Sequence, residues 1–127
     1  KLLDYENLDP PNNNEIFELA EGAFRRFNEK KKINNVVLKS DIYIKFNNKY
    51  LYLSKDDKKL DLVNENQINR NSRYIMYKTD SRLLEQLLKG PKFAHWNNAE
   101  IGSHINFFRS TDEYERNLHS SICFFHN

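Results

Sequence analysis

Residues 41–62, DIYIKFNNKYLYLSKDDKKLDL, decide the fold of this chain. Apolar residues alternate there with polar ones, which is the two-residue period of a strand with one buried face. Asn47-Asn48 and residues 56–59 are turn sequences, because Asn and Asp tolerate positive φ and bond to nearby main-chain groups. The pattern therefore predicts an antiparallel meander of strands 41–46, 50–53 and 60–62.

An amphipathic helix over residues 15–31 is predicted before this meander. Its apolar stripe has three- and four-residue spacing and consists of Ile16, Leu19, Ala20, Ala23, Phe24 and Phe27. Asn13 or Asn14 is the expected N-cap. Asp9-Pro10-Pro11 disfavours helix upstream. We therefore expect residues 1–14 to be a linker or arm from a preceding domain, and residues 15–127 to form a single α+β domain.

The second half of the chain continues the mixture of strands and helices. Tyr74–Lys78 is expected to be a fourth strand, followed by a Leu-rich helix that Asp80 begins and Gly90-Pro91 ends. Gly102–Arg109 is expected to be a fifth strand. Tyr114–Phe125 is expected to be a helix, although Ile122–Phe125 would also suit a buried strand. The expected fold is an antiparallel five-stranded sheet with helices packed on one face.

Composition limits the classes of function. The chain has 127 residues, with 20 basic and 18 acidic side chains and a net charge of +2. That balance argues against a nucleic-acid-binding protein, which usually carries a concentrated basic face. Cys123 is the single cysteine, so it predicts no internal disulfide and a reduced, cytoplasmic protein. No apolar run approaches the roughly 20 residues of a membrane-spanning helix.

The order of the elements carries a resemblance to a known fold. The residues that match are Tyr74–Lys78, Asp80–Gly90, Ala99, Gly102 and Phe124-Phe125. Together with the helix and meander before them, over about residues 15–125, they resemble the sterol carrier protein type 2-like fold. The stretch HWNNAEIGSH, residues 95–104, is further similar to the C-terminal domain found after metallo-β-lactamase-fold hydrolases, including those of the sialic acid nucleotide hydroxylase group.

This resemblance implies an apolar tunnel between the sheet and the helices. The residues expected to line it, or else to fill a solid core, are Leu84, Leu87, Leu88, Trp96, Ile101, Ile105, Phe107 and Phe124. Both alternatives stay open at this stage, because protein interiors normally pack near crystal density.

Residues 95–104 are unusually rich in side chains with defined hydrogen-bonding roles. In one interpretation they only cap and turn the chain around a core Trp96. In a second, a recognition surface is formed by His95, Asn98, Glu100 and His104 beside Trp96. In a third, His95, Glu100 and His104 bind zinc, although their spacing does not match His-Glu-x-x-His. We predict no metal and no cofactor in this chain.

The expected function is that of a non-catalytic accessory or binding domain. The resemblance implies that it holds a hydrophobic ligand or substrate for an upstream metallo-β-lactamase-fold hydrolase, or a related oxygenase, in the same polypeptide. The alternative is a protein-interaction or dimerisation module without a ligand. Expected partners are the preceding domain, an apolar ligand or a second copy of the chain, with no nucleic acid and no transmembrane segment.

Overall fold

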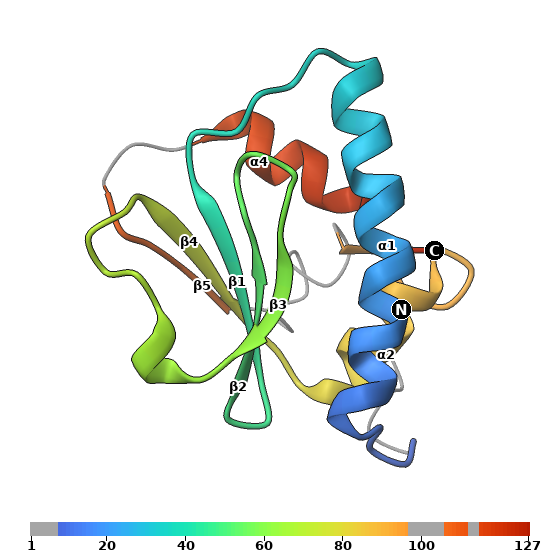
Figure 1. The fold of residues 1–127 in the computed structure, drawn as a ribbon. Coiled ribbons are helices and arrows are strands. Elements are labelled where there is room, and N and C mark those ends of the chain that lie inside the picture. Colours follow the sequence, from blue (N-terminus) through green and yellow to red (C-terminus); the bar gives the residue numbers. More distant parts are fainter. Residues whose placement is uncertain (1–7, 97–105, 112–114) are drawn as a thin grey trace.

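The structure, a computed structural model, describes residues 8–96, 106–111 and 115–127 (Figure 1). These residues form an α+β domain with three α-helices and one five-stranded sheet. The helices are α1 (Asn13–Ile33), α2 (Ser81–Lys89) and α4 (Arg116–Ser121), with short 3-10 helices η2 (Glu65–Gln67) and η3 (Ile122–Phe124). The strands are β1 (Asp41–Phe46), β2 (Lys49–Leu53), β3 (Leu60–Val63), β4 (Tyr74–Lys78) and β5 (Asn106–Arg109). In the described part of the chain, no helix combines the length and the apolar character needed to cross a membrane.

The sheet is mixed, so the prediction of a fully antiparallel sheet was wrong. Its strand order is β3-β2-β1-β4-β5, and β4 lies parallel to β1 with Ile75 beside Ile42. The other three pairs are antiparallel. Residues 64–73 carry the chain from β3, at one edge, back across the sheet to β4 on the far side of β1 (Figure 1). Alternation of apolar residues reveals a strand but not its neighbour, so the sequence pattern could not show this crossover.

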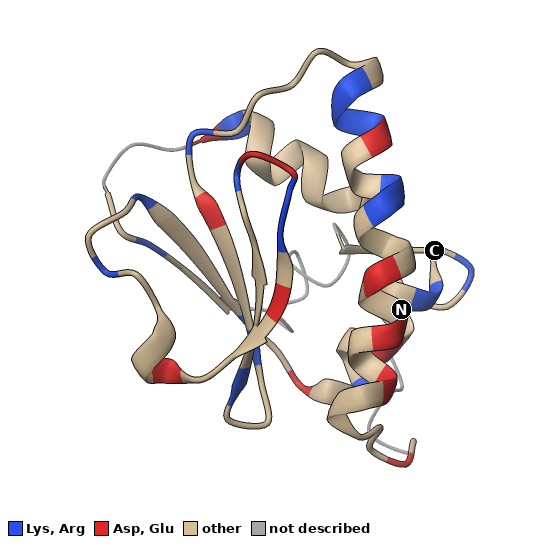
Figure 2. Cartoon of the chain, viewed as in Figure 1, with Lys and Arg blue, Asp and Glu red and all other residues tan. Residues whose placement is uncertain are grey.

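Helix α1 begins earlier than predicted because Asn12 is its N-cap. The Asn12 side chain accepts a hydrogen bond from the Glu15 amide at 2.8 Å, and the Glu15 carboxylate accepts one from the Asn12 amide at 3.0 Å. This reciprocal pair requires the acidic residue three positions after the cap. Asn12 meets that condition, and the expected caps Asn13 and Asn14 do not. Lys30, Lys31 and Lys32 lie at the other end of the helix, where its dipole favours cations (Figure 2).

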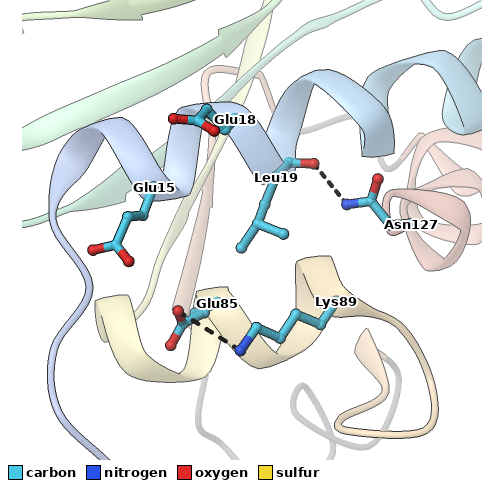
Figure 3. Close-up of a pocket in the computed structure, with 6 residues that line it drawn as sticks. All are labelled: Glu15, Glu18, Leu19, Glu85, Lys89 and Asn127. Carbon is cyan, nitrogen blue, oxygen red and sulfur yellow. Dashed lines mark hydrogen bonds and ion pairs between the residues drawn. The ribbon is translucent and has the colours of Figure 1, made fainter.

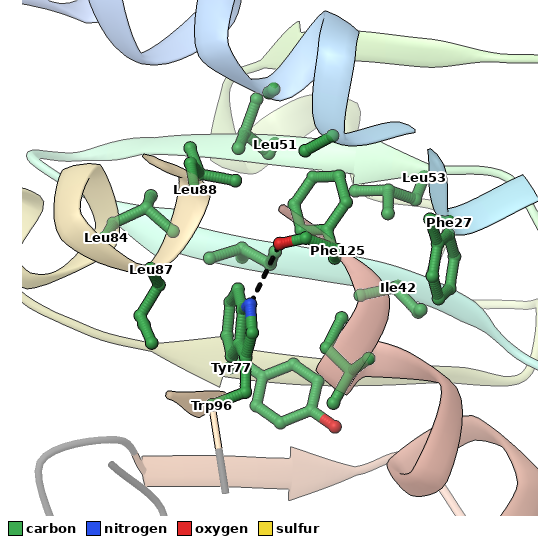
Figure 4. Packing of buried hydrophobic residues seen from close by; sticks show 14 of the residues in the cluster. Phe27, Ile42, Leu51, Leu53, Tyr77, Leu84, Leu87, Leu88, Trp96 and Phe125 are labelled. Carbon is green, nitrogen blue, oxygen red and sulfur yellow. Dashed lines mark hydrogen bonds between the residues drawn. The ribbon is translucent and has the colours of Figure 1, made fainter. Parts of the chain in front are cut away.

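The main core lies between the sheet and the helices (Figure 4). The sheet contributes Ile42, Ile44, Leu51, Leu53, Ile75 and Tyr77, and α1 contributes Ile16, Ala20, Ala23 and Phe27. Leu84, Leu87 and Leu88 of α2 close the core from the side, and Phe125 enters it from the C-terminal segment. Residues 116–124 are helical, so the helix expected in this region is confirmed and the alternative strand is wrong.

The opposite face of the sheet carries a second, smaller cluster of tyrosines. Tyr43, Tyr50, Tyr74 and Met76 pack there with Val63 and Ile68. Residues 64–73 lie over this face: the Asn69 amide donates to the Tyr43 hydroxyl at 3.2 Å, and Arg70 donates to the Tyr74 hydroxyl at 2.8 Å. A loop therefore covers this face, where a helix layer covers the other.

A buried ion pair fastens α1 to the turn between β2 and β3. The Lys31 side chain is almost fully buried, and its ammonium group donates to the Asp57 carboxylate. The same ammonium group lies 4.2 Å from the centre of the Phe27 ring. Asn28 donates to the Asp57 carbonyl oxygen at 3.1 Å. Asp57 has a φ of 67°, a conformation that Asp tolerates better than most residues.

Candidate functional site

The first two residues of the polar segment 95–104, in which a recognition surface was predicted, differ in exposure. His95 is exposed, whereas Trp96 retains only 2% of its accessible surface. The indole N–H of Trp96 donates to the carbonyl oxygen of Phe125 at 2.9 Å (Figure 4). Trp96 is therefore an anchor in the core, as in the structural interpretation of this segment. Asn98, Glu100 and His104 lie outside the described residues, as do Ile101 and Ile105 of the expected tunnel lining.

The remaining residues of the expected tunnel lining lie in different environments. Leu84, Leu87 and Leu88 are fully buried in the main core (Figure 4). Phe124 is only partly buried and lies under the Lys30 ammonium group, 5.7 Å from the ring centre. The neighbouring Phe125 fills the core position instead. These leucines are not among the residues that line the pocket beside Glu15 and Lys89 or the one beside Ser40 and Glu115.

Tyr77 and His119 form a polar pair that is surrounded by aromatic rings next to β5. The Tyr77 hydroxyl and His119 Nδ1 lie 3.2 Å apart, and both side chains are buried. The Phe107 ring packs edge-on against the His119 ring at 5.1 Å between centroids. The Trp96 ring lies 6.2 Å from the Tyr77 ring. These contacts fix the inner side of Phe107 against β4 and α4.

A second polar cluster joins the starts of β1, β4 and α4. Glu115 is 9% exposed and accepts a hydrogen bond from the Lys39 amide at 2.6 Å. Arg73 lies 3.9 Å from the other Glu115 oxygen and donates to the Ser40 hydroxyl at 2.9 Å. The cavity beside these groups has a volume of only about 10 Å³, about the size of one water molecule. These contacts fit a structural role, in which they hold β1, β4 and α4 together, better than a binding site for a ligand.

An open cleft of about 450 Å³ lies between α1 and α2 (Figure 3). It is lined by Glu15, Glu18, Leu19, Glu85, Lys89 and Asn127. Glu15 is used in the N-cap of α1, and Glu85 lies 3.8 Å from the Lys89 ammonium group. Asn127 bonds to the carbonyl oxygens of Leu19 and Leu88 and so ties the two helices together. Of the four charged side chains that line the cleft, Glu85 and Lys89 pair with each other.

Among the residues that the structure describes, no three His, Cys, Asp or Glu side chains gather closely enough to hold a metal ion.

The outer edge of β5 exposes two large apolar side chains. Phe107 is 48% exposed and Phe108 is 53% exposed, although both belong to a strand of the sheet. Phe107 pairs with Tyr77 on the helix side, and Phe108 pairs with Met76 on the tyrosine side. β5 ends the strand order, so no described strand lies beyond it. We call this surface, Asn106–Arg109 with its two phenylalanines, the β5 edge.

The sequence pattern placed Phe107 in the expected tunnel lining or core, whereas the structure leaves it 48% exposed, and Phe108 was not among the predicted site residues. Adjacent residues of a strand face opposite sides of a sheet, so Phe107 and Phe108 could not both enter the main core. That signal was available in the sequence. The position of β5 at the end of the sheet was not, because it depends on the crossover to β4.

Comparison with known proteins adds no relative. Searches of protein-family models, curated proteins and solved structures gave no significant match to this chain. The molecule is therefore defined by its own architecture, as an α+β domain in which the last strand of the described sheet carries two half-exposed phenylalanines.

Proposed function

We propose that the chain is a non-catalytic accessory domain that binds protein, and that the β5 edge is its contact surface. The observation that carries this proposal is the half-exposure of Phe107 and Phe108 on opposite faces of an edge strand. Aromatic residues are enriched in protein interfaces. An open strand edge also offers main-chain donors and acceptors that a partner strand can use.

The resemblance to the sterol carrier protein type 2-like fold supports a finer proposal. In it, the domain belongs to a polypeptide with a metallo-β-lactamase-fold hydrolase and holds an apolar ligand for that enzyme. Leu84, Leu87 and Leu88 are fully buried in the main core. Protein binding at the β5 edge therefore has more support from the described residues than ligand binding among these leucines.

Hydroxyl-radical footprinting tests the protein-binding proposal. The isolated chain, diluted until sedimentation shows a monomer, is compared with the same chain in the assembly purified from its natural source, and oxidation of individual phenylalanines is read by mass spectrometry. We expect Phe107 and Phe108 to be oxidised several-fold less in the natural assembly. Phe93 is the matched control, because it is 53% exposed and lies outside the β5 edge. Equal oxidation of all three residues in both samples would contradict the proposal.

Native mass spectrometry tests the finer proposal separately. Protein purified from cells without organic solvent is expected to carry a co-purifying apolar molecule, seen as a discrete mass increment that extraction removes. Protein that shows only the mass of the polypeptide would refute the ligand-holding role and leave the protein-binding role standing.

A further inference from the structure

The main chain of β5 alternates between bonds to β4 and the outer side of the sheet. The Ser110 amide donates to the Tyr74 carbonyl oxygen at 3.0 Å, and the register places Phe108 opposite Met76. Hydrogen-bonded pairs recur at every second residue of an antiparallel ladder. The Phe108 main chain therefore bonds to β4, and the main-chain groups of Phe107 and Arg109 point away from it.

We infer that the partner of the β5 edge is a second copy of this chain, paired antiparallel through β5 about a two-fold axis at Phe108. The inference rests on the proposed function and names its partner. In this register Phe107 of each copy lies opposite Arg109 of the other, and each of these two pairs exchanges two main-chain hydrogen bonds. The two sheets then form one continuous sheet across the axis.

The side chains of β5 suit this register. Phe108 lies on the tyrosine side, 6.1 Å from the Tyr74 ring, and meets Phe108 of the second copy across a non-hydrogen-bonded pair, where side chains approach most closely. Phe107 lies on the helix side, opposite Arg109 of the second copy. No two like charges face each other. The pairing uses the main chain of Arg109 and leaves the contacts of its side chain in place.

The other edge of the sheet is built differently. The Ser54 amide donates to the Lys59 carbonyl oxygen at 2.9 Å, so in β3 the main-chain groups of Leu60 and Leu62 point outward. A self-pairing that used both residues would place Asp61 opposite Asp61 of a second copy, which is destabilising. Charged side chains on an edge strand are a common protection against such pairing. β5 also carries one charge, Arg109, but pairing about Phe108 places it opposite Phe107 of the second copy and not opposite a like charge.

A contact between two four-residue strands is small, so we expect a dimer that dissociates on dilution. Cysteine cross-linking tests its register, in a chain where the half-buried Cys123 is replaced by Ser. Across a non-hydrogen-bonded pair the two Cα atoms are about 4.5 Å apart, within the span of a disulfide. Two copies of residue 107 are diagonal neighbours, about 7–8 Å apart, which is too far. Phe108→Cys is therefore the test variant and Phe107→Cys its matched control.

Mild oxidation followed by a non-reducing gel is expected to give mostly dimer for Phe108→Cys and little for Phe107→Cys. Sedimentation of the unmodified chain, which does not depend on folding of the variants, is expected to pass from 15.3 kDa to twice that mass as concentration rises. Equal cross-linking of both variants would overturn the register. A chain that stays monomeric at every concentration would overturn self-pairing. Footprint protection of Phe107 and Phe108 in the natural assembly would then still support the proposed function, with a different protein as partner.

Discussion

At the scale of single residues, two phenol groups on the tyrosine face of the sheet, those of Tyr43 and Tyr52, have raised pKa values. Burial raises the pKa of Tyr52 to about 12, and the nearby Asp41 carboxylate adds to this effect. Burial also raises the pKa of Tyr43, whose ring lies 5.1 Å from that of Tyr52. Both shifts favour the neutral phenol in the folded protein.

A pH dependence follows from the raised pKa of Tyr52. Its ordinary value is 10.0, so its contribution to stability is complete below pH 10 and is lost as pH rises from 10 to about 12. We expect the free energy of unfolding to fall over this range in the natural chain, and to fall less steeply in Tyr52→Phe. Urea denaturation at a series of pH values measures both slopes. Identical slopes for the two proteins would contradict the assignment to Tyr52.

The N-cap of α1 gives a second prediction for a single residue. Asn12→Ala removes the side-chain oxygen that accepts from the Glu15 amide, while the main-chain N–H that donates to the Glu15 carboxylate remains, and is expected to cost about 1 kcal/mol of stability. Asn14→Ala is the control, because Asn14 is an exposed residue inside the helix, where Ala is favourable. Thermal denaturation compares the two variants. A loss of stability confined to Asn14→Ala would show that the helix begins elsewhere.

At the scale of elements, the Lys31–Asp57 pair decides how firmly α1 is held to the sheet. Asp57→Asn preserves the positive φ and the carbonyl bond to Asn28, but leaves the buried Lys31 ammonium group without its counter-charge. Breaking a buried pair costs about 3–5 kcal/mol and an exposed one about 0–1. Asp57 is 38% exposed, so we expect about 1–3 kcal/mol.

A second variant separates this electrostatic effect from packing. Adding Lys31→Met to Asp57→Asn removes the uncompensated charge, and we expect the double variant to recover part of the lost stability. Chemical denaturation of the natural chain, the single variant and the double variant measures this recovery. A double variant that is less stable than Asp57→Asn would indicate that the Lys31 side chain stabilises the fold chiefly by packing.

Elements with their own local signal were predictable, and relations between elements were not. Strands 41–46 and 74–78 have the predicted limits, because period-two alternation and turn residues bound them on both sides. The helix ending at Gly90 also follows its prediction, since glycine takes the positive φ there. The parallel placement of β4 beside β1 was not predictable. It depends on the polar segment 64–73 crossing the tyrosine face, and that segment has no periodic pattern of apolar residues.

The same distinction applies to the candidate site. Trp96 and the leucines of α2 could be recognised as apolar groups, but only the packing with Phe125 shows that they fill the main core. Phe124 and Phe125 are indistinguishable in composition, and the turn of η3 decides which of them enters the core. The β5 edge could be recognised only from the strand order, which places β5 at the end of the described sheet.

At the scale of the whole molecule, the two outermost described strands, β3 and β5, differ in how well they suit pairing with a second copy. β3 carries Asp61 and the nearby Lys59, whose charged groups lie 4.0 Å apart. β5 presents two phenylalanines and outward main-chain groups. Self-pairing through β5 alone, about a two-fold axis, predicts a closed dimer and not a fibre.

Amide hydrogen exchange measured by NMR at two protein concentrations tests this central claim most directly. Raising the total concentration from far below the dimer dissociation constant to about ten times its value leaves about one fifth of the chains monomeric, so exchange of the outward Phe107 amide is predicted to slow about fivefold. The Phe108 amide, which bonds to β4, is predicted to be protected at both concentrations and serves as the internal reference. Exchange of the Phe107 amide at the same rate in both samples would contradict the account.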